Sequence, residues 1–173
     1  MKIIASKKFK NHMIAHEQDF LLPWEGLIKV CKEKGHFDNL DKPFEVLEIK
    51  LGRSIGYCNL VGVDGNDEII YAKRYGRDIY TKFAKRREPK VTDSLVIILN
   101  RSNKSNEEYF LVTMYPGNKS CKEPEDLNIL TKEELYEALE FWGNKALIYN
   151  ESIIQIDTVK TYCPYKNLYL AVA

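Results

Sequence analysis

The sequence has few cysteines, and they are too widely spaced to suggest a disulfide framework or a zinc site. The four are Cys31, Cys58, Cys121 and Cys163, and no two of them form a C-x-x-C pair. We therefore expect reduced thiols and a cytoplasmic location.

Long apolar runs and a net charge of one sign are also lacking. No stretch approaches the roughly 18 apolar residues of a membrane span, and the apolar run at the N-terminus is too short for a secretory signal. The chain carries 26 Lys and Arg against 25 Asp and Glu, a formal net charge of +1. Any affinity for a polyanion must therefore be local.

Several catalytic motifs are missing. The sequence has no G-x-x-x-x-G-K-[ST] loop, no G-x-G-x-x-G after a strand, no G-x-S-x-G elbow and no H-E-x-x-H helix. Their absence argues against kinases, ATPases, serine hydrolases and zinc peptidases, and we expect no cofactor. An ADP-ribosyltransferase stays open, because its signature residues are few and dispersed.

The length and pattern predict one α+β domain over residues 1–173, because 173 residues at 45% hydrophobic close one good core. We expect a curved antiparallel β-sheet packed against one or two helices. An N-terminal helical part spans about 1–50, and the sheet core spans about 55–173.

The first part of the chain predicts a short strand at residues 1–10 and then an amphipathic helix. Trp24, Leu27, Ile28 and Cys31 have helical spacing, Pro23 suits the first turn, and Gly35 suits the end. Residues 43–51 fit a strand or a short helix.

Two hairpins and a helix are predicted for the rest. Residues 57–63 and 67–73 flank the turn sequence Asp64-Gly65-Asn66, and residues 94–100 and 108–115 form a longer hairpin at the middle of the sheet. Thr131-Lys-Glu-Glu134 is a capping box that opens a helix, whose apolar stripe we expect on this sheet: Leu135, Ala138, Leu139 and Trp142. Residues 152–159 and 168–172 have the pattern of further strands.

Residues 73–90, here called the basic strip, concentrate positive charge. They hold eight cations against Asp78 and Glu88: Lys73, Arg74, Arg77, Lys82, Lys85, Arg86, Arg87 and Lys90. Such an excess suits a phosphate backbone, and interleaved rings such as Tyr75 offer stacking surfaces for unpaired bases. The alternative interpretation is a solvated loop anchored by its aromatic residues.

Thr113 and Tyr115 form a hydroxyl pair that alternation places on one face of a strand. Thr113 can donate to a phosphate oxygen, and Tyr115 can stack or transfer a proton. The structural alternative is that strands simply favour β-branched and aromatic residues.

The basic strip, then Thr92-Asp-Ser-Leu-Val-Ile-Ile-Leu, then Tyr109-Phe-Leu-Val-Thr-Met-Tyr-Pro-Gly117, resembles the sheet core of the barnase, EndoU, colicin and RelE-like ribonuclease superfamily of bacterial and phage toxins. The resemblance covers about residues 55–145. It implies metal-independent cleavage of RNA, tRNA or mRNA, in which the 2′-hydroxyl attacks the phosphate and leaves a 2′,3′-cyclic end. It also implies a cognate immunity or antitoxin protein as a partner.

The resemblance assigns roles to particular residues of this chain. Arg77 and Arg87 would neutralise the phosphorane, Thr113 would supply the hydroxyl, and Lys73 and Tyr115 are further catalytic candidates. Substrate binding would fall to four residues of the basic strip: Arg74, Tyr75, Lys85 and Arg86.

The histidines of this sequence lie upstream of the predicted sheet, at His12, His16 and His36. Members of the EndoU type use paired histidines, so His16 or His36 would have to be brought to the sheet by the first helix. Otherwise lysine, arginine and tyrosine share the proton transfer. His12 and His16 lie four residues apart, but without a third ligand we expect no metal site.

A non-catalytic binding module is the competing hypothesis. An immunity protein, an antitoxin or an inhibitor of a nuclease could use a mixed sheet of this size, since fold does not fix function.

Overall fold

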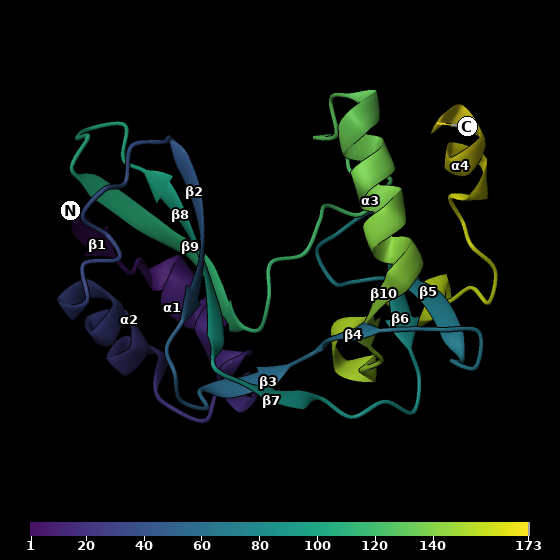
Figure 1. Cartoon of the computed structure of the whole chain (residues 1–173), viewed down its shortest axis with the longest axis horizontal. Coiled ribbons are helices and arrows are strands. Elements are labelled where there is room, and N and C mark those ends of the chain that lie inside the picture. The colour runs from purple at the N-terminus through teal and green to yellow at the C-terminus, as the bar shows by residue number, and fades with distance from the viewer. Residues whose placement is uncertain (173) are drawn as a thin grey trace. The chain divides into compact units, whose positions relative to one another are not determined.

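The computed structural model describes residues 1–172, and the chain folds into two compact units (Figure 1). Unit 1 comprises Met1–Cys58 and Lys90–Lys119, and unit 2 comprises Asn59–Pro89 and Ser120–Ala173. Each unit contains helices and strands, so the α+β class is confirmed. That residues 1–173 form one domain stays a prediction.

Unit 1 is built on a four-stranded sheet in the order β1-β9-β8-β2. Its strands are β1 (Lys2–Ile4), β2 (Phe44–Lys50), β8 (Ser94–Arg101) and β9 (Glu108–Pro116). Only the β1–β9 pairing is parallel. Unit 1 also contains a two-stranded antiparallel ribbon of β3 (Gly56–Cys58) and β7 (Lys90–Thr92).

The helices of unit 1 are α1 (Lys7–Ile14), the 3₁₀ turn η1 (Glu17–Asp19) and α2 (Trp24–Glu33). The expected strand within residues 1–10 is therefore only three residues long, because the Ser6 side chain caps α1 by accepting from the Phe9 N–H. The α2 prediction is confirmed, with Pro23 as N-cap and Gly35 at a φ of 74° just beyond the C-cap. The segment 43–51, expected as a strand or a short helix, contains the strand β2 (Phe44–Lys50).

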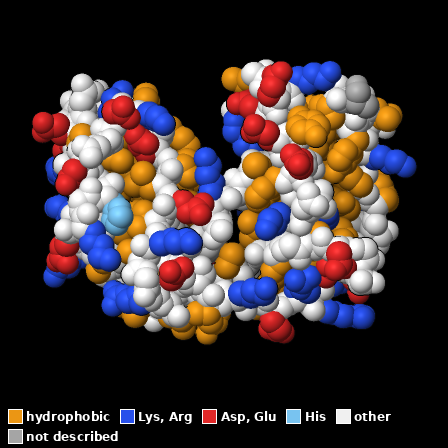
Figure 2. Space-filling model, viewed as in Figure 1, with side chains coloured by type: hydrophobic (Ala, Val, Ile, Leu, Met, Phe, Trp, Pro, Cys, Tyr) orange, Lys and Arg blue, Asp and Glu red, His pale blue; other side chains and the backbone are white. Residues whose placement is uncertain are grey.

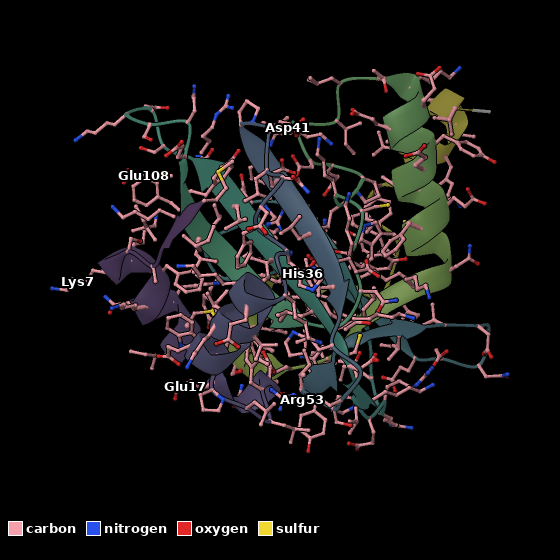
Figure 3. All side chains as sticks on the ribbon, turned by 60° about the vertical axis from the view of Figure 1, so that its left-hand side comes forward. Lys7, Glu17, His36, Asp41, Arg53 and Glu108 are labelled. Atoms are coloured by element: carbon pink, nitrogen blue, oxygen red, sulfur yellow. The ribbon has the colours of Figure 1, made fainter. Side chains whose placement is uncertain are left out.

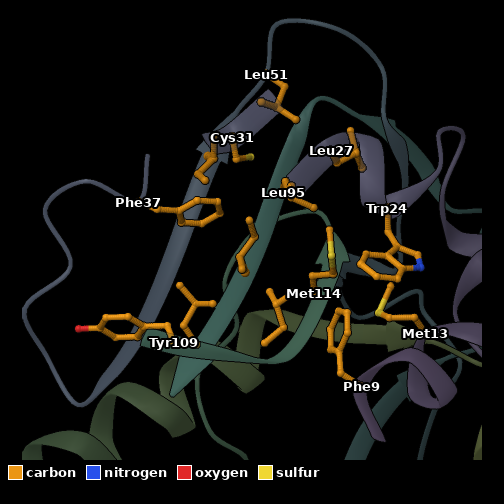
Figure 4. Close-up of a cluster of buried hydrophobic side chains, with 14 of the residues drawn as sticks. Phe9, Met13, Trp24, Leu27, Cys31, Phe37, Leu51, Leu95, Tyr109 and Met114 are labelled. Atoms are coloured by element: carbon orange, nitrogen blue, oxygen red, sulfur yellow. The ribbon is translucent and has the colours of Figure 1, made fainter. Parts of the chain in front are cut away.

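The core of unit 1 lies between α1, α2 and one face of this sheet. Figure 4 shows Phe9 and Met13 of α1 and Trp24 and Leu27 of α2 meeting strand residues such as Met114. The Phe9 and Trp24 rings pack edge to face, with 5.1 Å between centroids. Burial of these side chains fixes α1 against β9.

Unit 2 contains a second four-stranded sheet in the order β4-β10-β6-β5. Its strands are β4 (Leu60–Gly62), β5 (Ile69–Lys73), β6 (Tyr80–Ala84) and β10 (Lys145–Ile148). The helical elements are α3 (Lys132–Asn144), α4 (Lys166–Val172), η2 (Glu151–Ile153) and η3 (Ile156–Thr158). β10 runs parallel to β6 and antiparallel to β4.

The predicted hairpin of residues 57–63 and 67–73 is wrong. The turn forms, with the Asp64 side chain accepting from the Asn66 N–H. However, β10 and β6 lie between β4 and β5, so the two flanking strands do not pair. β5 instead pairs with β6 over five residues, a longer ladder than three-residue β4 can offer.

The predicted C-terminal strands are also wrong. Residues 152–159 form the short turns η2 and η3, and residues 168–172 lie in α4. The turns occupy the edge of β5, where the Gln155 N–H donates to the Lys73 carbonyl and Tyr71 exchanges backbone bonds with Lys160. Hydrogen bonds from this segment to β5 thus satisfy backbone groups of both, as the pairing of a regular strand would have done.

The long hairpin of β8 and β9 and the capping box of α3 are confirmed. Thr131 accepts from the Glu134 N–H, and the Glu134 side chain reaches back to the Thr131 N–H. The buried stripe of α3 is also confirmed at Ala138, Leu139 and Trp142. It does not lie on the β8–β9 hairpin, since Leu139 packs with Tyr71 and Tyr165 in unit 2.

The single sheet that was expected is therefore two four-stranded sheets, besides the β3–β7 ribbon. Residues 55–145 supply strands to both, because their chain passes from unit 1 to unit 2 and back. Within residues 1–172, no helix has the length and apolar character that crossing a membrane requires.

Candidate active site

The basic strip is largely neutralised within unit 2. Arg74 and Arg77 both contact Glu123, whose side chain is 5% exposed, and Arg77 also reaches Asp126. The Thr81 hydroxyl donates to the same Glu123 carboxylate. Two arginines and a hydroxyl therefore satisfy one buried carboxylate, and a phosphate would have to compete with it.

Other cations of the strip are paired in the same way. Lys73 contacts Asp78, Lys85 and Arg86 contact Glu68, and Arg87 contacts Asp67 at 2.7 Å. Lys82 is buried, and its ammonium donates to the carbonyls of Trp142 and Gly143 at the end of α3. Burial lowers the pKa of Lys82. Figure 2 shows acidic and basic side chains interspersed on the viewed face.

The structure assigns the predicted site residues to different units. Thr113 and Tyr115 lie on β9 in unit 1. The others lie in unit 2: Lys73, Arg74, Tyr75, Arg77, Lys85, Arg86 and Arg87. Arg74 and Arg77 converge on Glu123, and Lys85 and Arg86 converge on Glu68.

Thr113 contacts a histidine that the sequence interpretation left without a role. His12 Nε2 lies 3.0 Å from Thr113 Oγ1, although the two residues are 101 positions apart. β9 pairs with β8 along its length, whereas β1 pairs only with Glu108, Tyr109 and Phe110, and α1 contacts β9 as well. A register shift at Ile98 and Leu99 precedes Thr113 and distorts the ladder there.

A second histidine and a carboxylate adjoin this contact. The His12 and His16 rings are 4.6 Å apart between centroids, and His16 Nδ1 lies 3.2 Å from Asp19 Oδ2. Because Nδ1 contacts Asp19, Nε2 is the ring nitrogen of His16 that can exchange a proton with a ligand. We call His12, His16, Asp19 and Thr113 the histidine site.

Gly56 of β3 holds the carboxylate end of the histidine site against β9. A Cβ on Gly56 would meet the Asp19 carbonyl oxygen at 2.4 Å and the Pro116 ring at 2.4 Å. Phe20, next to Asp19, forms a bridge with Gly56, and the Leu21 N–H donates to the Ile55 carbonyl. Only glycine allows η1, β3 and the end of β9 to approach so closely.

The electrostatic surroundings of the histidine site differ from those of the basic strip. The first acidic residue of the chain is Glu17, so α1 carries only cations: Lys7, Lys8 and Lys10. Within residues 1–172, no carboxylate lies within ion-pair distance of these three lysines. Figure 3 shows Lys7 and Glu17 at separate places on unit 1. Lys8 precedes His12 by four residues and therefore shares its helix face.

The pKa of His12 is lowered from its ordinary value, first because partial burial disfavours the charged ring and second because His16 is nearby. A neutral imidazole whose Nε2 accepts from a hydroxyl is the form that a general base requires. The Thr113 hydroxyl occupies the position beside His12 Nε2, and it donates when His12 carries its proton on Nδ1.

His36 lies outside the histidine site. It follows α2, where its N–H donates to the Cys31 carbonyl, and its side chain is exposed (Figure 3). Cys31 is buried in the core, which raises the pKa of its thiol to about 11. Within the described part of the chain, no three His, Cys, Asp or Glu side chains group in a way that could hold a metal ion.

The sequence contained one signal for this site. His12 and His16 are four residues apart, and helical spacing alone places such a pair side by side. Their meeting with Thr113 had no local signal, because it depends on how α1 packs on β9.

Comparison with known proteins adds no family to this geometry. No protein-family model, curated protein or solved structure matches this chain.

Proposed function

We propose that the chain is a metal-independent endoribonuclease whose proton-transfer groups are His12 and His16. The observation that carries the proposal is the 3.0 Å contact of His12 with Thr113, next to the His16–Asp19 pair. Two histidines side by side supply a base and an acid for one in-line displacement at phosphorus. Positioned proton transfer contributes about 10² to 10⁴-fold to such reactions.

His12 is the base in this mechanism, because its lowered pKa keeps the ring neutral. It removes the proton of the ribose 2′-hydroxyl, which then attacks the adjacent phosphorus. The 5′-oxygen leaves, and His16 donates the proton that it needs. The products are a 2′,3′-cyclic phosphate and a 5′-hydroxyl, and the two histidines exchange their protonation states.

Thr113 and the lysines of α1 serve the phosphate. When a ribose 2′-hydroxyl occupies the position beside His12 Nε2, the Thr113 hydroxyl is released to donate to a non-bridging oxygen. Lys8 supplies positive charge on the same helix face, and no carboxylate among residues 1–172 neutralises it. Seven of the eight cations of the basic strip already have carboxylate or carbonyl partners, so we give the phosphate-binding role to α1.

A catalytic triad fits this geometry less well. In a triad the carboxylate orients the histidine that activates the hydroxyl. Here Asp19 contacts His16, whereas His12 is the residue that contacts Thr113. The arrangement therefore suits an acid–base pair better than a threonine nucleophile.

The test is cleavage of an end-labelled RNA by the purified chain in EDTA, with identification of the product ends. We expect cyclic ends from the wild type and a loss of about 10² to 10⁴-fold for His12→Ala. Thr113→Val keeps the shape and removes the hydroxyl, and it should cost about 10² to 10³-fold. The control is His36→Ala, which should cleave like the wild type.

No cleavage by the wild type would refute the proposal, as would equal cleavage by His12→Ala. Tight binding of a protein partner without cleavage would instead favour a non-catalytic module. The toxin character and a cognate immunity or antitoxin protein belong to the same proposal. They predict that wild-type clones are recovered poorly and His12→Ala clones normally.

A further inference from the structure

A hollow of about 300 Å³ lies within unit 1, and its lining includes Glu17 and Phe20, the chain neighbours of His16 and Asp19. Its lining comes from one continuous segment, residues 17–25, that begins at the residue after His16. The lining residues include Phe20, Leu21 and Trp24. Its size is at the lower end of ligand pockets and suits one planar ring system rather than a whole nucleotide.

The walls of this hollow are held in place before any ligand binds. Trp24 is 9% exposed, and its ring packs against Phe9 in the core. The Phe20 backbone is bridged to Gly56, and the Leu21 N–H donates to Ile55. Leu21 is 46% exposed, so an apolar surface faces solvent at the mouth. A flat apolar ligand would bind without reordering the segment.

Two acidic side chains, Glu17 and Glu25, flank the apolar walls. Within residues 1–172, neither carboxylate has a hydrogen-bond or ion-pair partner, and both residues are exposed. A carboxylate only accepts hydrogen bonds, so it selects for N–H groups on a ligand and against carbonyl oxygens. The exocyclic amino group of a nucleobase is such a donor.

We infer that this hollow binds the base of the leaving nucleoside and prefers a base with an exocyclic amino group over uracil. The inference rests on the proposed function, because His16 protonates the 5′-oxygen of that nucleoside and Glu17 is the next residue. Cytosine and uracil test it sharply. Cytosine presents an amino group where uracil presents a carbonyl oxygen.

The kinetic test compares the dinucleotides UpC and UpU, which differ only in the leaving nucleoside. We expect the wild type to cleave UpC with a kcat/KM about tenfold higher, the size of one hydrogen bond to a charged group. Glu17→Gln and Glu25→Gln should each reduce this preference, because an amide can turn to donate to uracil. Glu33→Gln is the control, since Glu33 is an exposed acid at the far end of α2.

A binding test separates this inference from the proposed function. Cytidine and uridine are titrated into the His12→Ala variant, and the tryptophan fluorescence is followed, in which Trp24 lines the hollow and Trp142 lies in unit 2 as a constant background. We expect cytidine to quench it at a lower concentration than uridine, and Glu17→Gln to remove the difference. Binding of this kind without RNA cleavage would overturn the ribonuclease and leave a base-binding site.

Two results would overturn the subsite. One is equal kcat/KM for UpC and UpU in the wild type. The other is an unchanged preference in both glutamine variants while cleavage and the thermal midpoint are retained.

Discussion

Replacing Gly56 with alanine should destabilise unit 1 through a clash whose size can be worked out from the structure. The added Cβ would meet the Asp19 carbonyl oxygen and the Pro116 Cγ at 2.4 Å, and the Pro116 Cβ at 2.8 Å. Real Cβ atoms essentially never approach other heavy atoms within 3.0 Å, and a backbone oxygen and a proline ring cannot swing away. Overpacking a tight site costs about 1–3 kcal/mol, and we expect about 3 kcal/mol here.

The matched control is Gly26→Ala, in the first turn of α2. A Cβ at Gly26 meets nothing within 4 Å, and the residue is exposed. Alanine is a better helix former than glycine, so this variant should gain about 0.5–1 kcal/mol. The same substitution is thus expected to lower the free energy of unfolding at Gly56 and to raise it at Gly26.

The assay is urea denaturation followed by circular dichroism. With a slope of about 2 kcal/mol/M, Gly56→Ala should unfold at about 1.5 M less urea than the wild type. RNA cleavage below that transition should also fall, because the Asp19 end of the histidine site is displaced. Equal midpoints for Gly56→Ala and the wild type would refute the close approach of η1, β3 and β9.

Three further predictions concern burial, capping and protonation. Glu123→Ala leaves two arginines without their buried carboxylate and should cost about 3–5 kcal/mol in urea denaturation, whereas exposed Glu137→Ala should stay within about 0.5 kcal/mol. Thr131→Ala removes the cap of α3 and should lower the free energy of unfolding by about 1 kcal/mol, and no change would contradict the capping box. Because the pKa of His12 is lowered, the midpoint of the acid limb of the kcat/KM profile should lie below pH 6.5. An NMR titration of His12 should give a pKa at the same pH. As the pH falls, His12 is protonated in the unfolded chain before it is protonated in the folded chain. The contribution of His12 to the free energy of unfolding is therefore full above about pH 6.5 and is lost as the pH falls through the pKa of His12 in the folded chain. His12→Gln should reduce this loss of stability at low pH. A His12 pKa at or above 6.5 in the folded chain would contradict the prediction.

Local patterns in the sequence predicted the elements that depend on local physics. The apolar spacing from Trp24 to Cys31 predicted α2, and the capping box predicted the start of α3. The two apolar runs around residues 101–107 predicted the β8–β9 hairpin. In each case the residues that decide the structure are neighbours in the chain.

The partners of the strands were not predictable in the same way. β5 pairs with β6 and β4 pairs with β10, and β10 comes more than eighty residues after β4 in the chain. Periodicity marks a strand but does not say which strand it pairs with. The C-terminal segment 152–159 also has strand-like periodicity, yet its backbone groups bond to the edge of β5 through turns.

The candidate site shows the same limit. Charge counting identified the basic strip, but Glu123 and Asp126 neutralise part of it from about fifty residues away. Thr113 was identified from its strand, whereas its partner His12 lies on α1. Burial of Phe9 and Met13 brings that helix to β9, and such packing has no signature at either residue.

The most direct test of the central claim uses a short RNA with one 2′-deoxy position. The RNA carries a single cleaved phosphate, and the enzyme is supplied in EDTA. We predict a 2′,3′-cyclic product from the all-ribose RNA and none from the RNA that lacks the 2′-hydroxyl at that phosphate, and we predict that His12→Ala cleaves the all-ribose RNA about 10² to 10⁴-fold more slowly. Cleavage of the deoxy-substituted RNA at the same bond would refute attack by the 2′-hydroxyl, and wild-type rates from His12→Ala would refute the role of His12 as the base.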